Sequence, residues 1–335
     1  IKQSNKAHRV AQSYINGINH FIQYGSSPIE FHILGINKTK FSLEDAYCIA
    51  GYMAFGFEQA FITDSIISYI YEKLGHKSLE DFGIHLPEQQ VKNASHNKHM
   101  LANFELLSEL GRKTSPLAGI SSLWGSNGWV VSGKYTQSGK PLLANDPHII
   151  FAAPSIWHEA HIKTPNFELY GHFIPGIPVA LLGHNKDISW GITMLENNQL
   201  NFFREHTDKT KPLHTKFKNR WVKNSVRNET IKVKGQTSHN FNIVTTPHGP
   251  IISNLLKGFK DNPETISMEW EFANSKNDLL DIFYQMAHAT NNIKQFKQQV
   301  ARIKSPGLNI MYADKQGDIG WWAAGTIQIN KSSYS

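Results

Sequence analysis

The spacing of apolar positions predicts helices in the first third of the chain. Within residues 8–24, large apolar side chains recur every three or four positions, at Val10, Tyr14, Ile18 and Phe21. That is the period of one helix face. Ser42, followed by Glu44 and Asp45, predicts the start of a second helix, because a hydroxyl caps the first turn and acids suit its positive end.

The run 46–74 is apolar on most faces and stops at Gly75. It is long enough for one long helix or two shorter ones, and a helix that is apolar all round belongs in a protein interior. Met53 and Phe57 lie four positions apart, hence on one face. Core packing is sufficient to explain that pair.

Connecting segments follow from polarity and from glycine and proline. Loops are expected at 28–35 and 76–98, a further helix at 99–112, and an exposed linker at 112–125.

After residue 126 the pattern changes to short β-branched and aromatic runs separated by turn residues, which predicts strands. The expected strands are 129–133, 141–145, 157–163, 167–172, 179–184, 188–193, 200–205, two within 229–253, 268–272, 308–312 and 319–324. The first two should form a hairpin around residues 137–140. Helices are expected at 278–289 and 293–303. Helices, then many strands, then helices indicate an α+β fold.

Composition narrows the class of protein. The chain has 335 residues, 40% of them hydrophobic, which is enough for a large core. Its 34 basic and 27 acidic side chains give a net charge of +7, but no dense Lys/Arg run or nucleic-acid motif occurs, so the charge indicates a solvated basic surface. The single Cys48 excludes an internal disulfide, and no apolar run reaches transmembrane length.

One candidate for chemistry stands where the helical and strand-rich parts meet, at Gly125-Ser126. Gly125 lacks a Cβ, so it can adopt backbone angles that open its carbonyl to attack. If the peptide bond before Ser126 is cut, this residue gains a free α-amine with a pKa of about 8, whose neutral form can take the hydroxyl proton. An ordinary Gly-Ser turn before a strand explains the same two residues.

His148 follows Ser126 on the second strand of the predicted hairpin, where its imidazole could reach the Ser126 hydroxyl. A turn histidine after Asp146-Pro147 is the alternative, because the chain has 17 histidines. No metal site is expected, since residues 158–161 lack the spacing of a zinc motif. No phosphate-loop, dinucleotide or α/β-hydrolase serine motif occurs.

Several short motifs resemble, in order and rough spacing, the penicillin acylase family of N-terminal nucleophile hydrolases. They lie at residues 125–131, 143–148, 183–193, 248–250, 311–314 and 317–320. The resemblance runs from about residue 8 to the last strand. The Ser-Asn-x-Trp start and the Gly-His-Asn…Trp-Gly-x-Thr run are specific together and modest singly.

The resemblance implies a four-layer αββα sandwich of the N-terminal nucleophile hydrolase type, incomplete in this chain. A helical part, residues 1–125, and a strand-rich part, residues 126–335, would together make one fold. The precursor would cut itself between Gly125 and Ser126. Ser126 would then attack an amide carbonyl, form an acyl-enzyme and pass the acyl group to water, with its own amine as base.

Two further roles are implied by the resemblance. The backbone N–H of Met194 matches the position of an oxyanion-hole donor, a group that contributes about 10²–10³ in rate. His148 stands where the family has Gln or His, and a His there is more similar to cephalosporin and acyl-homoserine lactone acylases than to penicillin G acylases. The family's second donor is an Asn in a later segment that this chain is expected to lack, and Asn309, in an earlier motif, is not given that role.

The acyl pocket is also implied by the resemblance. Met53 and Phe57 match a Met and a Phe that the family places against the acyl group, which gives them a binding role beside core packing. Ile149, Leu182 and Leu308 match other pocket positions. All three are aliphatic, which favours an alkyl acyl chain or a pocket of different shape.

No cofactor is expected. Family calcium sites use acids, whereas this chain has Asn198 and Asn201 in the corresponding stretch, and Thr63 or Asp64 where a helix Glu is expected. Neutral amide oxygens are weaker calcium ligands than carboxylates, so no strong calcium site is expected.

The resulting hypothesis is a self-processing amidohydrolase that acts on a small-molecule acyl amide, such as a β-lactam side chain or another N-acyl compound. Hydrolysis of acyl-homoserine lactones is an alternative with the same chemistry. A degenerate, unprocessed homologue acting as a binding protein is the non-enzymatic alternative, and a basic-surface binding protein would need a Lys/Arg patch that the sequence lacks. The resemblance implies export to the periplasm.

Overall fold

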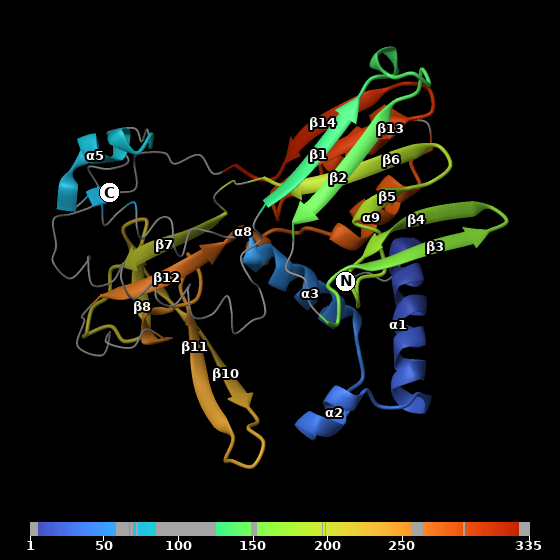
Figure 1. The fold of residues 1–335 in the computed structure, drawn as a ribbon. Coiled ribbons are helices and arrows are strands. Elements are labelled where there is room, and N and C mark those ends of the chain that lie inside the picture. Colours follow the sequence, from blue (N-terminus) through green and yellow to red (C-terminus); the bar gives the residue numbers. More distant parts are fainter. Residues whose placement is uncertain are drawn as a thin grey trace. The chain divides into compact units, whose positions relative to one another are not determined.

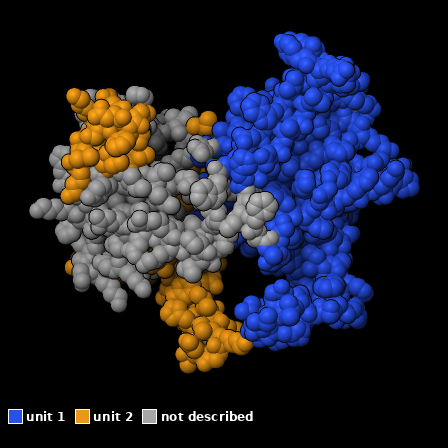
Figure 2. Space-filling model, viewed as in Figure 1, with its two compact units in different colours: residues 1–57, 120–197, 275–326 blue, residues 58–119, 198–274, 327–335 orange. Residues whose placement is uncertain are grey.

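The computed structural model describes residues 6–57, 67, 70–71, 73–84, 125–148, 153–195, 197, 199–255, 264–290 and 292–327. The chain forms two compact units (Figure 2). Unit 1 comprises residues 1–57, 120–197 and 275–326, and unit 2 comprises residues 58–119, 198–274 and 327–335. Each unit takes residues from both sides of position 125.

Unit 1 contains five described helices, which are α1 (Lys6–Tyr24), α2 (Ile29–Leu34), α3 (Leu43–Gly56), α9 (Leu279–Ala287) and α10 (Ile293–Val300). The predicted start of α3 is confirmed, because the Ser42 hydroxyl accepts the Asp45 N–H and Asp45 accepts the Ser42 N–H. The loop predicted at 28–35 is wrong. Pro28 and Gly35 bracket a short helix, in keeping with the preference for proline before the first turn and for glycine after the last one.

A six-stranded antiparallel sheet forms the centre of unit 1 (Figure 1). Its order is β14-β13-β6-β5-β4-β3. The strands are β3 (His158–Thr164), β4 (Phe167–Phe173), β5 (Leu182–His184), β6 (Ile188–Met194), β13 (Leu308–Asp314) and β14 (Ile319–Ala324). They confirm the predicted strands, although β5 is shorter than the predicted 179–184.

A two-stranded hairpin, β1 (Gly125–Val131) and β2 (Leu142–His148), packs on one face of this sheet. Gly128 lies against Met311 of β13, since a Cβ on the glycine would come within 2.1 Å of the methionine Sδ. The next residue, Tyr312, packs on Phe296 of α10 with ring centroids 4.8 Å apart. Because alternate side chains of a strand point to opposite faces, the hairpin and α10 cover opposite faces of the sheet.

The described residues of unit 1 therefore form three layers, namely hairpin, six-stranded sheet and helices. This is an α+β architecture, as predicted. The fourth layer of the predicted sandwich is not among the described residues, and the outer face of the hairpin carries exposed side chains such as Trp129 and Leu142.

The Asn145 side chain joins the hairpin to the sheet. Its Nδ2 donates to the carbonyl oxygens of Asn127 (2.9 Å) and Ile192 (3.0 Å), and its Oδ1 accepts the Ile192 N–H (2.8 Å). The amide thus pairs with Ile192 as a neighbouring strand would, on the edge of β6 that the short β5 leaves open. Gly191 permits this approach, because a Cβ there would meet Asn145 at 2.9 Å.

A partly buried polar cluster ties α1, α3 and α9 together. The Tyr47 hydroxyl donates to Asp278 Oδ1 (2.7 Å), and His8 Nε2 lies 3.0 Å from Asp278 Oδ2. Asp278 also caps α9 by accepting the Asp281 N–H. Burial alone would raise the pKa of Asp278, but the hydrogen bonds from Tyr47 and Asp281 and the neighbouring His8 lower it below its ordinary value.

The described part of unit 2 consists mainly of antiparallel strand pairs. Its described elements are β7 (Leu200–Glu205) with β12 (Thr265–Trp270), β8 (His214–Phe217) with β9 (Arg220–Lys223), β10 (Ser225–Ile231) with β11 (His239–Thr245), and the short helices α5 (His76–Asp81) and α8 (Glu271–Asn274). The loop predicted at 76–98 begins with α5 instead. The helix predicted at 99–112 and the linker at 112–125 lie, up to Gly125, outside the described residues.

The β8–β9 hairpin was not predicted. Its turn residues Lys218 and Asn219 both have positive φ, of 47° and 60°. This is the backbone that two-residue hairpin turns adopt, and Asn tolerates it better than most residues. The Lys-Asn step between two strand-forming runs was the available signal.

The His-Gly-Pro motif at 248–250 lies in unit 2 and packs against a buried carboxylate. His248 Nδ1 lies 3.1 Å from Glu205 Oε1, which also accepts the hydroxyls of Thr246 (2.5 Å) and Ser267 (2.6 Å). The imidazole stacks on Phe203 at a centroid distance of 4.0 Å. The motif therefore joins β7, β12 and the turn after β11.

We expect Asn145→Ala to lower the free energy of unfolding by about 2–4 kcal/mol, because the N–H and C=O of Ile192 both lose their partner and each unsatisfied group costs about 1–3 kcal/mol. Urea unfolding measures this. Asn228→Ala, on the exposed face of β10, is the matched control and should change stability by less than about 0.5 kcal/mol. Equal losses in the two variants would contradict the role given to Asn145.

Asp278 predicts a pH dependence of stability. A carboxyl whose folded pKa is lowered stabilises the protein above its unfolded pKa, about 3.9, and this contribution is lost as the pH falls through the folded pKa. Asp278→Asn should therefore be less stable than the wild type at pH 7, and the difference should shrink below about pH 4. Tyr47→Phe, which removes one of the hydrogen bonds to Asp278, should show a weaker form of the same dependence. Urea midpoints between pH 7 and pH 3 test this, and a constant difference would contradict it.

Candidate functional site

Ser126 lies at the beginning of β1 with its hydroxyl against the peptide bond that precedes it. The Ser126 Oγ donates to the Gly125 carbonyl oxygen at 2.7 Å. Gly125 has a φ of 140°, a conformation that residues with a Cβ rarely adopt, whereas a Cβ there would meet no atom within 4 Å. Glycine is therefore needed for its backbone conformation rather than for space.

Pro147 lies opposite Ser126 in the ladder between β1 and β2. Proline has no N–H, so this pair occupies a position of the ladder at which neither residue bonds the other. Consequently the N–H and C=O of Ser126 point away from β2, towards the edge of β1 that no described strand pairs with. The nitrogen of the Gly125–Ser126 peptide is thus outside the hydrogen bonds that hold the hairpin together.

His148 is on the opposite face of the hairpin from the Ser126 hydroxyl. It pairs in register with Gly125, one position away from Ser126, and alternate positions point to opposite faces. Its Nε2 lies 2.8 Å from Asp146 Oδ2 and 3.5 Å from Asn127 Nδ2. The expected contact between the imidazole and the Ser126 hydroxyl is therefore not made. A shared hairpin was correctly inferred, but the register sends the two side chains to different faces.

A cleft of about 440 Å³ lies beside Ser126, between the hairpin and the six-stranded sheet. Its lining includes Ser126, Thr193, Asn309, Met311 and Trp321. Met194 follows Thr193 and lies at the end of β6, so the structure brings the predicted oxyanion donor to this end of the sheet.

Asn309 and Trp321 line this cleft but were given no role from the sequence. The Asn309 Nδ2 donates to the Met194 carbonyl oxygen (3.0 Å), and its Oδ1 accepts the Trp321 Nε1–H (3.2 Å). The available signal was an asparagine within an otherwise apolar strand, Leu-Asn-Ile-Met-Tyr-Ala. Its family position suggested no role, and only the pairing of β13 with β6 shows what it contacts.

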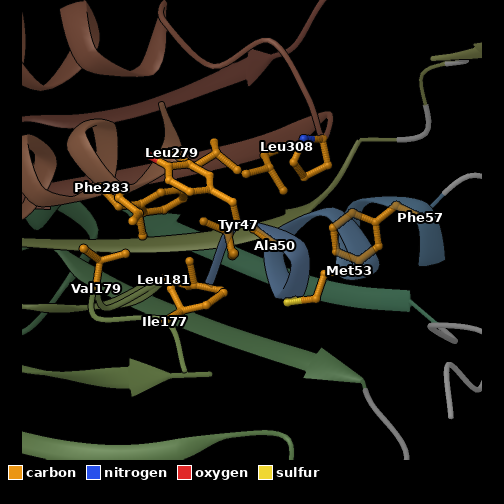
Figure 3. Close-up of a pocket in the computed structure, with 13 residues that line it drawn as sticks. Tyr47, Ala50, Met53, Phe57, Ile177, Val179, Leu181, Leu279, Phe283 and Leu308 are labelled. Carbon is orange, nitrogen blue, oxygen red and sulfur yellow. The ribbon is translucent and has the colours of Figure 1, made fainter. Parts of the chain in front are cut away.

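An apolar cavity of about 50 Å³ lies on the helix side of the sheet. Helix α3 contributes Tyr47, Ala50 and Met53, and Phe57 follows at its C-terminal end. The other walls include Val179, Leu181, Ile192, Phe283 and Leu308. Figure 3 shows Met53 and Phe57 at one end of the cavity and Phe283 and Val179 at the other. The structure thus brings together three of the predicted pocket residues, Met53, Phe57 and Leu308.

Leu182 does not line this cavity in the structure. The preceding residue, Leu181, does so, while Leu182 is buried in β5. Because side chains alternate along a strand, a match one position off exchanges an inward residue for an outward one. Ile149 lies outside the described residues.

The cavity and the cleft lie on opposite faces of the same end of the sheet. Leu308 lines the cavity and Asn309 the cleft, and Ile192 and Thr193 are divided in the same way. Adjacent residues of one strand point to opposite faces. The ends of β6 and β13 therefore form the boundary between the Ser126 cleft and the apolar cavity.

Tyr47 supplies the hydroxyl at the wall of the cavity. Burial, together with the hydrogen bond to Asp278, raises the pKa of Tyr47, so the phenol stays neutral. Its hydroxyl is taken by Asp278, which leaves the ring as the surface presented to the cavity.

Within the described part of the chain, no group of three or more His, Cys, Asp or Glu side chains is placed to hold a metal ion. Asn201 lies in β7, while Thr63, Asp64 and Asn198 are outside the described residues. None of the described helices has the length and apolar character to cross a membrane.

Comparison with known proteins identifies relatives of this chain. It is similar to the acyl-homoserine lactone acylase QuiP of Pseudomonas fluorescens (strain Pf0-1), with 30% identity over 65% of this chain and 27% of that protein. It is also similar to penicillin G acylase of Escherichia coli, with 27% identity over 62% of this chain and 24% of that protein. The chain thus spans about a quarter of the length of these relatives.

A solved structure shares the fold. The thermostable penicillin G acylase from Alcaligenes faecalis superposes with a TM-score of 0.53 and 24% identity, over 59% of this chain and 35% of that one. The family described as penicillin amidase matches residues 1–334, which include the Gly125-Ser126 step, the Ser126 cleft and the apolar cavity. The chain therefore belongs to the penicillin amidase family.

Proposed function

We propose that this chain carries the nucleophile of a self-processing amidohydrolase, which cleaves an acyl amide through an acyl-enzyme on Ser126. The observation that supports it most directly is the position of the Ser126 hydroxyl, 2.7 Å from the carbonyl oxygen of its own preceding peptide, beside an open cleft. Membership of the penicillin amidase family supports the same chemistry.

Processing begins with attack of Ser126 Oγ on the Gly125 carbonyl carbon. The bond from that carbon to the Ser126 nitrogen breaks, the nitrogen takes up the hydroxyl proton, and an ester replaces the amide. Water then hydrolyses the ester, which releases the Gly125 carboxylate and leaves Ser126 with a free amine and hydroxyl. Gly125 favours the first step by holding its carbonyl in a backbone conformation, with φ of 140°, that residues with a Cβ rarely adopt.

In turnover, the neutral α-amine of Ser126 takes the hydroxyl proton as Oγ attacks the substrate carbonyl. The Met194 N–H stabilises the oxyanion. The amine leaving group departs with a proton, and water releases the acyl group as a carboxylic acid. The proton passes to the α-amine rather than to His148, because the imidazole lies on the other face of the hairpin.

The acyl chain would occupy the apolar cavity. It would pass from Ser126 around the ends of β6 and β13, where Leu308 and Asn309 separate the cavity from the cleft. The lining is apolar apart from the Tyr47 hydroxyl, which suits an alkyl or aromatic acyl group.

Two substrate classes fit this chemistry. The named relatives include acyl-homoserine lactone acylases and a penicillin G acylase. The aliphatic Leu181, Ile192 and Leu308 in the cavity favour an alkyl chain and hence an N-acyl-homoserine lactone. We also propose that the protein acts in the periplasm, and the family resemblance is the support for this.

We expect the full-length wild type to separate into two chains, the second beginning at Ser126, and Ser126→Ala to stay whole and inactive. Intact mass and N-terminal sequencing measure this. Ser132→Ala, six positions further along the same segment, is the matched control and should be processed like the wild type. A folded wild type that remains a single chain would contradict the proposal and favour a binding protein.

We expect changes in the cavity to shift the preferred acyl length in opposite directions. Ala50→Leu fills the cavity and should lower kcat/KM for the longest accepted chain by about tenfold, whereas Met53→Ala should favour longer chains, because each methylene in an apolar pocket changes kcat/KM by roughly tenfold or more. A panel of N-acyl-homoserine lactones measures this. Tyr52→Ala, on the exposed face of α3, should leave the preference unchanged. The same preference in all four proteins would exclude the cavity as the acyl site.

A further inference from the structure

The amide of Asn309 has an orientation fixed by its partners. The indole N–H of Trp321 can only donate, so the atom 3.2 Å from it must be the Asn309 oxygen. The Met194 carbonyl can only accept, so the atom 3.0 Å from it must be the nitrogen. Rotating the amide by half a turn would lose both hydrogen bonds.

Asn309 holds the main chain on both sides of Met194. Through the ladder it pairs with Thr193, the residue before Met194. Through its side chain it holds the Met194 carbonyl, and the N–H of that same peptide, which belongs to Leu195, donates to the Gly307 carbonyl at 3.0 Å. The peptides that precede and follow Met194 are therefore fixed by the beginning of β13.

The Met194 N–H has a defined direction in this arrangement. The N–H of Ile192 points to the edge of β6 away from β13, where Asn145 accepts it. Two residues further along a strand, the N–H points to the same edge. The Met194 N–H therefore points to the same open edge of β6 as the Ile192 N–H, beyond the position that Asn145 occupies. The Ser126 cleft lies at this end of the sheet.

We infer that Asn309 is a positioning residue for the reaction at Ser126, whose amide, oriented by Trp321, keeps the Met194 N–H aimed at the oxyanion. This inference rests on the proposed function. An N–H that is held before the reaction stabilises the oxyanion without having to reorganise, and this preorganisation is the main source of such stabilisation. Loss of the Asn309 amide leaves the donor in place but frees it to move.

The test uses the processed full-length protein and the N-acyl-homoserine lactone or phenylacetyl amide on which the wild type is most active. Asn309→Asp replaces the donor by an oxygen facing the Met194 carbonyl, and Asn309→Ala removes the amide. Trp321→Phe keeps a ring but removes the N–H that orients the amide. Active sites are counted by mass after reaction of Ser126 with a sulfonyl fluoride, so that kcat refers to competent protein only.

We expect kcat to fall by between tenfold and a hundredfold in both Asn309 variants, which is less than the loss of a whole donor. KM should change by less than about threefold, because the donor acts mainly in the transition state. Trp321→Phe should show a smaller fall of the same kind. Asn228→Asp and Trp221→Phe, both in unit 2, are matched controls for the chemical changes and should keep the wild-type kcat.

Unchanged kcat per active site in both Asn309 variants, with an active wild type, would overturn the inference and leave the proposed function standing. A rise in KM without a fall in kcat would also overturn it, since it would indicate substrate binding instead. If an Asn309 variant folds but stays unprocessed, the other Asn309 variant and Trp321→Phe are compared with the wild type by kcat instead. If the Asn309 variants do not fold, the kcat of Trp321→Phe decides. A wild type that neither cuts itself nor hydrolyses any amide refutes the proposed function first.

Discussion

The pairing of the Asn145 amide with the main chain of Ile192 holds the Ser126 hairpin on the sheet. A side-chain amide has the same donor and acceptor as a peptide, so it can replace a missing strand at one position. Because β5 begins only at Leu182, β6 has an open edge at Ile192, and Asn145 satisfies that edge from a neighbouring layer. The two layers thereby acquire a fixed register, and the position of Ser126 relative to Met194 depends on that register.

Asn309 uses the same chemistry from the other side of β6. One asparagine reaches the strand from the hairpin and the other from β13, and between them they fix three consecutive residues, 192–194. The same strand end separates a polar cleft from an apolar cavity, since Thr193 faces one and Ile192 the other. Because side chains alternate along a strand, adjacent residues line the two sites that an acyl transfer needs, a polar cleft for the reacting carbonyl and an apolar cavity for the acyl chain.

Much of the fold could be predicted from the sequence, because helices and strands with a buried face carry a regular apolar period. The spacing of 8–24, the capping residues Ser42 and Asp45, and the strands of the central sheet were all correctly inferred. Features that depend on how the strands pair with one another could not be predicted in this way. The face of His148 follows from the register of β1 and β2, the choice of Leu181 over Leu182 from one position along a strand, and the role of Asn309 from its partners β6 and β14. The loop predicted at residues 28–35 was wrong for a different reason, since proline and glycine mark the ends of a short helix as readily as they mark a loop.

Pro147 gives the proposed cleavage a particular structural consequence. A newly cut chain end usually frays, because its first residues lose hydrogen bonds that the intact backbone made. The nitrogen of Ser126 makes no bond to β2 even before cleavage, because the Ser126–Pro147 pair stands at a position of the antiparallel ladder where the two residues do not bond each other. The residues that follow keep every bond of the ladder when the chain is cut. A terminal amine formed here would therefore have the order of a residue inside a strand from the moment it appears, and its lone pair would be directed by the sheet instead of by a flexible end.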